Sequence, residues 1–314
     1  MLRRLPFLLF LTSLIVWPAG STWARDKKPT RSQPSKAPAK SPSKARKPSK
    51  AAPSKASKSM AAPTAPPVAA AGALDLAAKG AIVVDAWSGD TLFQKNADTR
   101  YYPASTTKIM TGLLVIESGG LDKPVEVTEE DARVGESSLS IHAGEQFSRR
   151  QMLYGLLLKS ANDVAHALGR DNAGSIEAFA EKMNRRAREL GCTNTHFANP
   201  HGLHHPEHYT TPRDLALITR AAMSQPLFRQ IVATRQAPWD TPRGVIPLTN
   251  HNRLLGKFPG CIGVKTGYTI PAQQVLASAA SREGKEAIAV VMHTNKPGIW
   301  EDSAKLLAYA LEHP

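Results

Sequence analysis

Residues 101–116 read Tyr-Tyr-Pro-Ala-Ser-Thr-Thr-Lys-Ile-Met-Thr-Gly-Leu-Leu-Val-Ile. The apolar residues that follow Lys108 fall on nearly every face of a helix, and a helix of this kind is buried. Ser105 and Lys108 are three residues apart, so their side chains share one face, with Cβ atoms about 5–6 Å apart. The stretch therefore predicts a buried helix over 105–118 that begins with a hydroxyl within reach of an amine.

Two further motifs give this spacing its meaning, because Ser41-Pro-Ser-Lys44 has the same spacing in a Pro-rich segment. Ser160-Ala-Asn162 stands between two helical patterns, where a lone serine is an ordinary N-cap. Lys265-Thr-Gly267 follows a short apolar stretch and predicts an edge strand that a ligand can approach closely. In this order, the three reproduce the S-x-x-K, S-x-N and K-T-G set of penicillin-recognising serine enzymes.

The folded part has strands at its ends and helices between them. A Gly-containing turn joins strands 80–85 and 91–94, and two more strands are expected at 274–281 and 286–293. Helical spacing covers 105–118, 149–159, 161–169, 175–190, 212–224 and 299–311. The pattern predicts an α/β fold in which one antiparallel sheet, made from both chain ends and flanked by helices, carries an inserted helical lobe.

Residues 73–314 resemble the low-molecular-mass penicillin-binding proteins of the D-alanyl-D-alanine carboxypeptidase type, which are serine D,D-peptidases. The resemblance extends to Gly135-Glu-Ser-Ser-Leu139, His201-Gly-Leu203 and Arg213-Asp-Leu-Ala216. It implies a β-lactamase/transpeptidase-like fold, peptidoglycan stem peptides as substrate, β-lactam antibiotics as covalent inhibitors, and no metal or other cofactor.

The resemblance also implies roles for eight residues. Ser105 would be the acylated nucleophile and Lys108 its base, with Ser160 and Asn162 as proton-relay and positioning groups. Lys265, Thr266 and Gly267 would line the substrate-binding strand, with the two polar side chains on the substrate carboxylate. The backbone amides of Ser105 and Tyr268 would form the oxyanion hole.

A lysine base makes a physical demand on this site. At pH 7 a free lysine is neutral in only about one molecule in 2,500, which is roughly 4–5 kcal/mol against its acting as a base. Burial of Lys108 and the like charge of Lys265 would both lower its pKa.

Two positions depart from the family pattern. The Pro271-Ala-Gln-Gln274 stretch lacks the Gly that relatives usually carry after the substrate-binding strand, which leaves the shape of the cleft rim open. His251 stands where relatives often have Arg or Thr, and a neutral His at pH 7 would weaken the hold on a terminal carboxylate.

The first 72 residues are expected to lie outside this domain. Arg3 and Arg4 precede an apolar run from Leu5 to Trp17, and several small residues follow, up to Ala24. This pattern predicts a signal peptide over 1–24 and hence an exported protein, in the periplasm or at the extracellular face of the wall. Residues 25–72 are rich in Lys, Pro, Ser and Ala and predict a disordered linker.

Most of the net charge of +14 lies in these first residues. Between 25 and 58 there are twelve basic residues and one acid, and with Arg3 and Arg4 they account for 13 of the 14 charges. The domain is thus nearly neutral and carries no signal for nucleic-acid binding. The linker is either a plain solvated spacer or a segment that binds anionic envelope polymers.

The sequence leaves room for other kinds of site. His201, His204, His205 and His208 cluster with Glu207, but without an H-E-x-x-H helix they predict no zinc peptidase. A β-lactamase would need a deacylating Glu in the helical lobe, and a non-catalytic wall-binding module would need a broken motif set. Cys192 and Cys261 can form a disulfide in an exported protein, or remain two free thiols.

The expected reaction is removal of the terminal D-alanine of a stem peptide through an acyl-enzyme on Ser105. The alternative is a D,D-endopeptidase that cuts peptidoglycan cross-links, since the two activities share every catalytic group.

Overall fold

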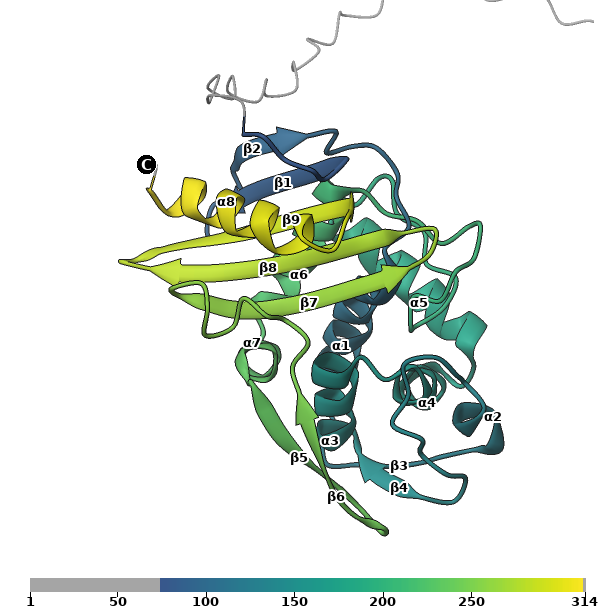
Figure 1. The fold of residues 1–314 in the computed structure, drawn as a ribbon. Helices are drawn as coiled ribbons and strands as arrows, with labels where there is room; N and C mark the ends of the chain where they lie inside the picture. Colours follow the sequence, from purple (N-terminus) through teal and green to yellow (C-terminus); the bar gives the residue numbers. More distant parts are fainter. Residues whose placement is uncertain (1–73, 313–314) are drawn as a thin grey trace, which may run out of the picture. The chain divides into compact units, whose positions relative to one another are not determined.

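A computed structural model describes residues 74–312 of the chain. Its centre is a five-stranded sheet in the order β2-β1-β9-β8-β7, and every pairing is antiparallel (Figure 1). The strands are β1 (Gly80–Asp85), β2 (Thr91–Lys95), β7 (Cys261–Thr269), β8 (Gln273–Arg282) and β9 (Lys285–Thr294). The predicted sheet from both chain ends is confirmed, and β7, which carries Lys265-Thr-Gly267, is an edge strand.

Both faces of the sheet are buried, which explains the almost uninterrupted apolar run of β9. Along β1, Ala81 and Val83 pack with the C-terminal helix α8 (Gly298–Glu312), whereas Ile82 and Val84 point to the opposite face. That second face is covered by α6 (Pro212–Met223), which also contacts the helix carrying Lys108. The alternation of side chains along each strand thus divides the apolar residues between two cores.

The helical lobe is inserted between β2 and β7. Its central member is α1 (Lys108–Glu117), preceded by a 3₁₀ turn, η1 (Ala104–Thr107), and followed by further helices (Figure 1). These are α2 (Glu129–Ala132), α3 (Arg149–Tyr154), η2 (Gly155–Lys159), α4 (Asn162–Ala173), α5 (Ile176–Glu189), α6 and α7 (Pro226–Ala233). The side chains of Ser148, Ser175 and Thr211 cap three of them, and Thr211-Pro212 forms the predicted N-cap and N1 pair.

Two small hairpins were not predicted. Strands β3 (Pro124–Glu126) and β4 (Gln146–Ser148) form one, and β5 (Gln236–Thr241) and β6 (Gly244–Thr249) form the other. In the second hairpin Pro238 lies opposite Pro247. Proline cannot donate to a strand ladder, so its presence argues against a strand in the sequence, and only a two-stranded ribbon with free outer edges tolerates both.

Several predictions concern residues or groups away from the sheet. The proposed signal peptide and linker lie outside the described residues. Within residues 74–312, none of the helices has the length and apolarity needed to cross a membrane, and no cluster of His, Cys, Asp or Glu side chains could hold a metal ion. Cys192 and Cys261 are both free thiols, so the open question of a disulfide is answered in favour of unpaired cysteines.

We expect Asp302 to be a main anchor of the first described residues. This carboxylate is 1% exposed and accepts from the backbone amides of Ala77, at 3.2 Å, and Ala78, at 2.7 Å. Asp302→Ala would leave two amides without partners and should lower the free energy of unfolding by about 1–3 kcal/mol. Urea denaturation measures this, with the exposed neighbour change Glu301→Ala as control; equal stabilities for the two variants would refute the anchor.

Candidate active site

Ser105 sits in the tight turn that precedes α1. The turn is closed by Pro103, whose carbonyl accepts from the amide of Thr106 at 3.2 Å and from its hydroxyl at 2.6 Å. Ala104 has a φ of +47°, a left-handed conformation that is unusual for a residue other than glycine. The turn leaves the Ser105 side chain half-buried in the wall of the main cleft.

Lys108 is fully buried and its amine contacts three oxygens from three parts of the chain. Nζ lies 3.0 Å from Ser105 Oγ, 2.7 Å from Asn162 Oδ1 and 2.6 Å from the carbonyl of His201. The amide of Asn162 is oriented by its other end, because Nδ2 donates to the carbonyl of Gly135 at 3.1 Å. Ser105 and Asn162 thus lie within hydrogen-bond distance of one amine, that of Lys108.

These three contacts fix the direction of the Ser105 hydroxyl. A neutral amine has two N–H donors and one lone pair, while amide and peptide oxygens can only accept. Asn162 and the His201 carbonyl therefore take both N–H groups of a neutral Lys108. The lone pair is left for Ser105, whose O–H donates to it, which is the arrangement a general base requires.

The environment of Lys108 favours its neutral form. Burial lowers its pKa well below the usual value for lysine, and the nearby Lys265 charge acts in the same direction. Asp163 and Glu136 oppose the shift. The carboxylate of Asp163, however, is turned to other donors, since it accepts from the Ser138 hydroxyl at 2.6 Å and from the amides of Leu139 and Ile141.

Ser160 and Lys265 form the opposite side of the site. Ser160 ends η2 in a left-handed conformation with φ of +66°, and Lys265 Nζ donates to its Oγ at 3.0 Å. The same amine donates to the carbonyl of Thr266 at 2.8 Å. Because the Ser160 oxygen accepts from Lys265, its own proton is free to point elsewhere.

Two glycines allow the backbone segments to close on the turn of Ser105. A Cβ on Gly267 of β7 would lie 2.9 Å from the amide nitrogen of Ser105, and one on Gly202 would lie 1.9 Å from the carbonyl oxygen of Ala104. Gly202 also has a φ of +87°, which favours glycine. Any side chain at either place would push β7 or the 201–203 loop away from the nucleophile.

The main cleft is a cavity of about 490 Å³ that runs past these groups. It is lined by Ser105 and Ser160 at one end and continues along Thr266, Gly267 and Tyr268 of β7. All eight residues singled out in the sequence thus lie in or directly behind one cleft. Tyr268 is 55% exposed, so its side chain lies at the rim of the cleft.

The two departures from the family pattern have structural outcomes. The turn after β7 contains a residue in the left-handed conformation that is not glycine. This residue is Gln273, which has a φ of +56° and whose side chain donates to the carbonyl of Ile270. His251 lines the cleft, and its pKa is lowered to about 4, first by desolvation and then by the charge of Lys265. The prediction of a neutral His251 at pH 7 agrees with this shift.

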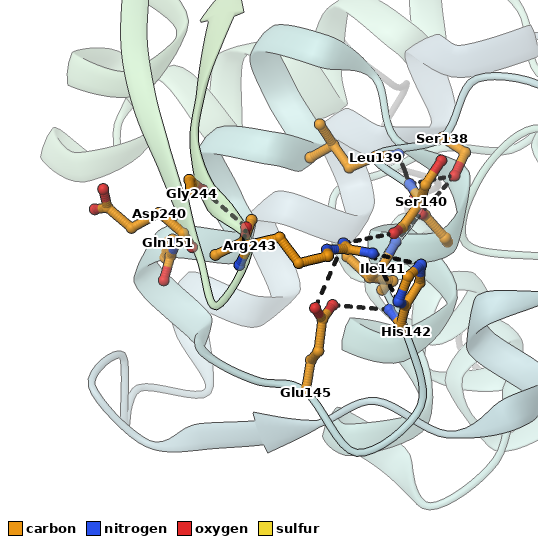
Figure 2. A network of polar contacts seen from close by, with 12 residues as sticks. Ser138, Leu139, Ser140, Ile141, His142, Glu145, Gln151, Asp240, Arg243 and Gly244 are labelled. Atoms are coloured by element: carbon orange, nitrogen blue, oxygen red, sulfur yellow. Dashed lines mark hydrogen bonds and ion pairs between the residues drawn. The ribbon is translucent and has the colours of Figure 1, made fainter. Parts of the chain in front are cut away.

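A loop over residues 135–145 forms one wall of the cleft and is held on two sides. On the inner side the carbonyl of Ser137 accepts from the amide of Asn162 at 2.6 Å. On the outer side Arg243, at the tip of the β5–β6 hairpin, reaches across to it (Figure 2). Its guanidinium donates to the carbonyl of Ser140 at 3.0 Å and to the ring of His142, and lies 3.4 Å from Glu145. Sequence reasoning missed this tie, because Arg243 and the loop are some hundred residues apart.

Two histidines of the 201–208 loop form contacts that support the site. His208 Nδ1 accepts from the amide of Ala198 at 3.1 Å, so Nε2 carries the proton and donates to Thr107 Oγ1 at 2.8 Å. Burial lowers the pKa of His208 to about 3 and also lowers that of His201, so both are neutral. They support the start of α1, and His201 contributes a backbone carbonyl to Lys108, a role that no side-chain motif could have indicated.

Comparisons with known proteins identify the family of this chain. Residues 66–296 match the family model described as D-alanyl-D-alanine carboxypeptidase. The chain belongs to this family. The predicted serine D,D-peptidase, a penicillin-binding hydrolase of the cell wall, is thereby confirmed, and carboxypeptidase is favoured over the endopeptidase alternative.

Named relatives come from several bacteria. The chain is 37% identical over 241 residues to the D-alanyl-D-alanine carboxypeptidase of Streptomyces sp. strain K15, covering 71% of this chain and 83% of that one. It is 36% identical over 223 residues to D-alanyl-D-alanine carboxypeptidase DacF of Bacillus subtilis, covering 68% of this chain. It spans only 57% of the length of the Bacillus relative.

Solved structures confirm the predicted β-lactamase/transpeptidase-like fold. The crystal structure of the Streptomyces K15 DD-transpeptidase superimposes with a TM-score of 0.73 at 34% identity, covering 76% of this chain and 99% of that one. D-alanyl-D-alanine carboxypeptidase DacD of Francisella tularensis gives a TM-score of 0.72 at 32% identity, with 76% and 71% covered.

The second buried lysine predicts a pH dependence of stability. Burial lowers the pKa of Lys265 from 10.5 to about 7. Between these two values the unfolded chain binds more protons than the folded one, so the free energy of unfolding rises with pH, and below pH 7 the cost of a buried charge is fully present. The stability of wild type relative to Lys265→Met should therefore rise by about 2 kcal/mol from pH 7 to pH 9. Chemical denaturation across this range measures it, and a constant difference would contradict the shift.

Proposed function

We propose that this protein is a serine-type D-alanyl-D-alanine carboxypeptidase, which removes the terminal D-alanine of peptidoglycan stem peptides through an acyl-enzyme on Ser105. The observation that carries the proposal is the buried Lys108 amine, whose two N–H groups have fixed acceptors and whose lone pair faces the Ser105 hydroxyl. A neutral amine held in this way is suited to take the proton of an attacking serine.

In the proposed first step, Ser105 Oγ attacks the carbonyl carbon between the two D-alanines and its proton moves to Lys108 Nζ. The backbone amides of Ser105 and Tyr268 donate to the oxyanion that develops. The terminal carboxylate is bound by Lys265 and Thr266, and its negative charge favours the protonated form of Lys265.

Collapse of the tetrahedral intermediate breaks the peptide bond. The leaving nitrogen takes the free proton of the Ser160 hydroxyl, whose oxygen accepts from Lys265. The proton that Lys108 took from Ser105 then replaces it, directly or by way of Lys265, so that Lys108 is neutral again. D-alanine departs and an ester on Ser105 remains. Water then attacks this ester with Lys108 as base, releasing the shortened stem peptide and the free serine.

Ser105→Ala tests both the nucleophile and the reaction. The variant should lose covalent labelling by a fluorescent penicillin, and release of D-alanine from a soluble pentapeptide stem should fall by a factor on the order of 10³ or more. Ser224→Ala, an exposed serine at the end of α6, is the matched control and should label normally. Covalent labelling of Ser105→Ala at the wild-type rate would refute the assignment.

The same proteins separate the two peptidase reactions. A monomeric pentapeptide muropeptide and a cross-linked dimer are incubated with wild type and the products are resolved by chromatography. We expect loss of one D-alanine from the monomer. A dimer that is split while the monomer stays intact would replace carboxypeptidase by endopeptidase as the function.

We also propose that the enzyme works outside the cytoplasm and that its basic segment over residues 25–58 contacts anionic envelope polymers. The support is the signal-peptide pattern and the twelve basic residues with one acid. Binding of this kind rests on counterion release and weakens with salt.

Retention on isolated cell walls tests the contribution of this segment. The full chain should bind more strongly than a chain that begins at Gly72 at about 50 mM salt, and the difference should largely disappear near 500 mM salt, where the screening length is only a few ångströms. Equal retention of both chains at low salt would reduce the segment to a spacer.

A further inference from the structure

A second pocket opens beside the main cleft, at the base of the β5–β6 hairpin and the segment that leads to β7. It has a volume of about 500 Å³ and shares Thr249, Asn250 and Arg253 with the cleft wall. No part of the reaction proposed above uses it.

The pocket gathers positive charge that nothing in residues 74–312 neutralises. Arg235, Arg253 and Lys257 line it, no acidic residue does, and none of the three forms an ion pair or a side-chain hydrogen bond with the described residues. Arg150 and Arg229, by contrast, are each paired with a carboxylate. Arg253 makes a cation–π contact, with its guanidinium carbon 6.0 Å from the centre of the Trp300 ring.

The wall of the pocket also contains a polar group without a partner. Asn252 is 3% exposed, and its Oδ1 accepts from the amide of Leu254 at 3.0 Å, which fixes the orientation of the side chain. Its amide nitrogen has no hydrogen-bond partner among the described residues. Buried donors are normally satisfied, so an unpaired donor on a residue that lines the pocket is a second unusual feature of this wall, beside its unpaired cations.

The backbone around the pocket is held in place before any ligand arrives. Asn250 donates through Nδ2 to the carbonyls of Val232 and Thr234, and its own amide donates to the carbonyl of Arg235 at 2.9 Å. Gly256 has a φ of +75°, and a Cβ there would lie 3.1 Å from Nη1 of Arg235, so the guanidinium lies close over this glycine. The backbone that frames the pocket is therefore held in place, while the three cationic side chains that it carries are exposed to solvent.

We propose that this pocket binds a carboxylate of a second stem peptide, which anchors the enzyme on polymeric peptidoglycan while another stem peptide occupies the main cleft. Three unpaired cations and a free amide donor suit an oxyanion, and guanidinium groups match the planar carboxylate. The inference rests on the proposed function, because that substrate is a polymer carrying many peptide carboxylates. A second contact on the same polymer raises the effective concentration of substrate at the cleft.

The test compares polymer with soluble substrate. Arg235→Gln/Lys257→Gln removes two cations that lie outside the main cleft, and Arg185→Gln/Arg188→Gln, on the exposed surface of α5, is the control with the same change in charge. With the full chain, the pocket variant should release D-alanine from isolated sacculi with kcat/KM lowered about fivefold or more, since each lost charge-assisted contact weakens the anchor. Its kcat/KM on a soluble pentapeptide, and that of the control on either substrate, should match wild type.

Three outcomes would overturn the proposal. They are wild-type activity of the pocket variant on sacculi, an equal loss on the soluble peptide, and an equal loss in the control variant. Binding measurements separate the source of the anion: the difference in retention between wild type and variant must persist on sacculi stripped of phosphate polymers and vanish on glycan whose stem peptides have been removed by an amidase. A difference that follows the phosphate polymers refutes a peptide carboxylate.

The proposed function can fail separately. If wild type released no D-alanine from the soluble pentapeptide, carboxypeptidase activity would be refuted, while retention on peptide-bearing and peptide-free glycan would still decide whether the pocket binds stem-peptide carboxylates.

Discussion

The site depends on keeping the amine of Lys108 buried and uncharged. An amine without contact with water must have acceptors for its N–H groups, and here they come from the start of α4, through Asn162, and from the loop at His201. Each of these segments is in turn fixed by others: Asn162 by the 135–145 loop, and the His201 loop by the close approach of Gly202 to the turn of Ser105. The geometry around one nitrogen therefore requires the sheet edge, the helical lobe and the connecting loops to be assembled together. This requirement explains why so many conformations that cost free energy, such as the positive φ of Ala104 and Ser160, lie around the cleft.

Much of this arrangement could be predicted from sequence because its signals are local. The three-residue spacing of Ser105 and Lys108 fixes their shared face, and the alternating and continuous apolar runs at both chain ends indicate the strands of a buried sheet. The β5–β6 hairpin could not be predicted in the same way, since Pro238 and Pro247 argue against strands and only their pairing explains them. The tie from Arg243 to the 135–145 loop joins residues distant in sequence, and the carbonyl of His201 is a backbone group, so neither leaves a pattern of side chains to detect.

The histidine-rich loop illustrates how burial changes the meaning of a motif. Four histidines near one glutamate are a plausible metal site on composition. Both ring nitrogens of His208, however, form hydrogen bonds, one with the amide of Ala198 and one with the hydroxyl of Thr107. Burial favours the neutral ring, and a neutral ring has one donor and one acceptor to place. In this fold the histidine serves as a bridge from the 196–210 segment to α1, which carries the base, whereas His251, also neutral at pH 7, lines the cleft.

The two buried lysines are the same residue type in one site, and their surroundings explain why they can hold different protonation states. Lys108 has two oxygens that can only accept and one hydroxyl that can also donate, so a neutral amine satisfies every contact. Lys265 has the Ser160 hydroxyl and the Thr266 carbonyl as acceptors, which leaves the third N–H of a charged ammonium without a partner among residues 74–312. A substrate carboxylate would supply that partner and favour the charged form of Lys265, but its own negative charge would offset the effect of Lys265 on Lys108. The neutral state of Lys108 therefore depends mainly on its burial and on its two fixed acceptors, so that one lysine can hold the carboxylate while the other accepts the Ser105 proton.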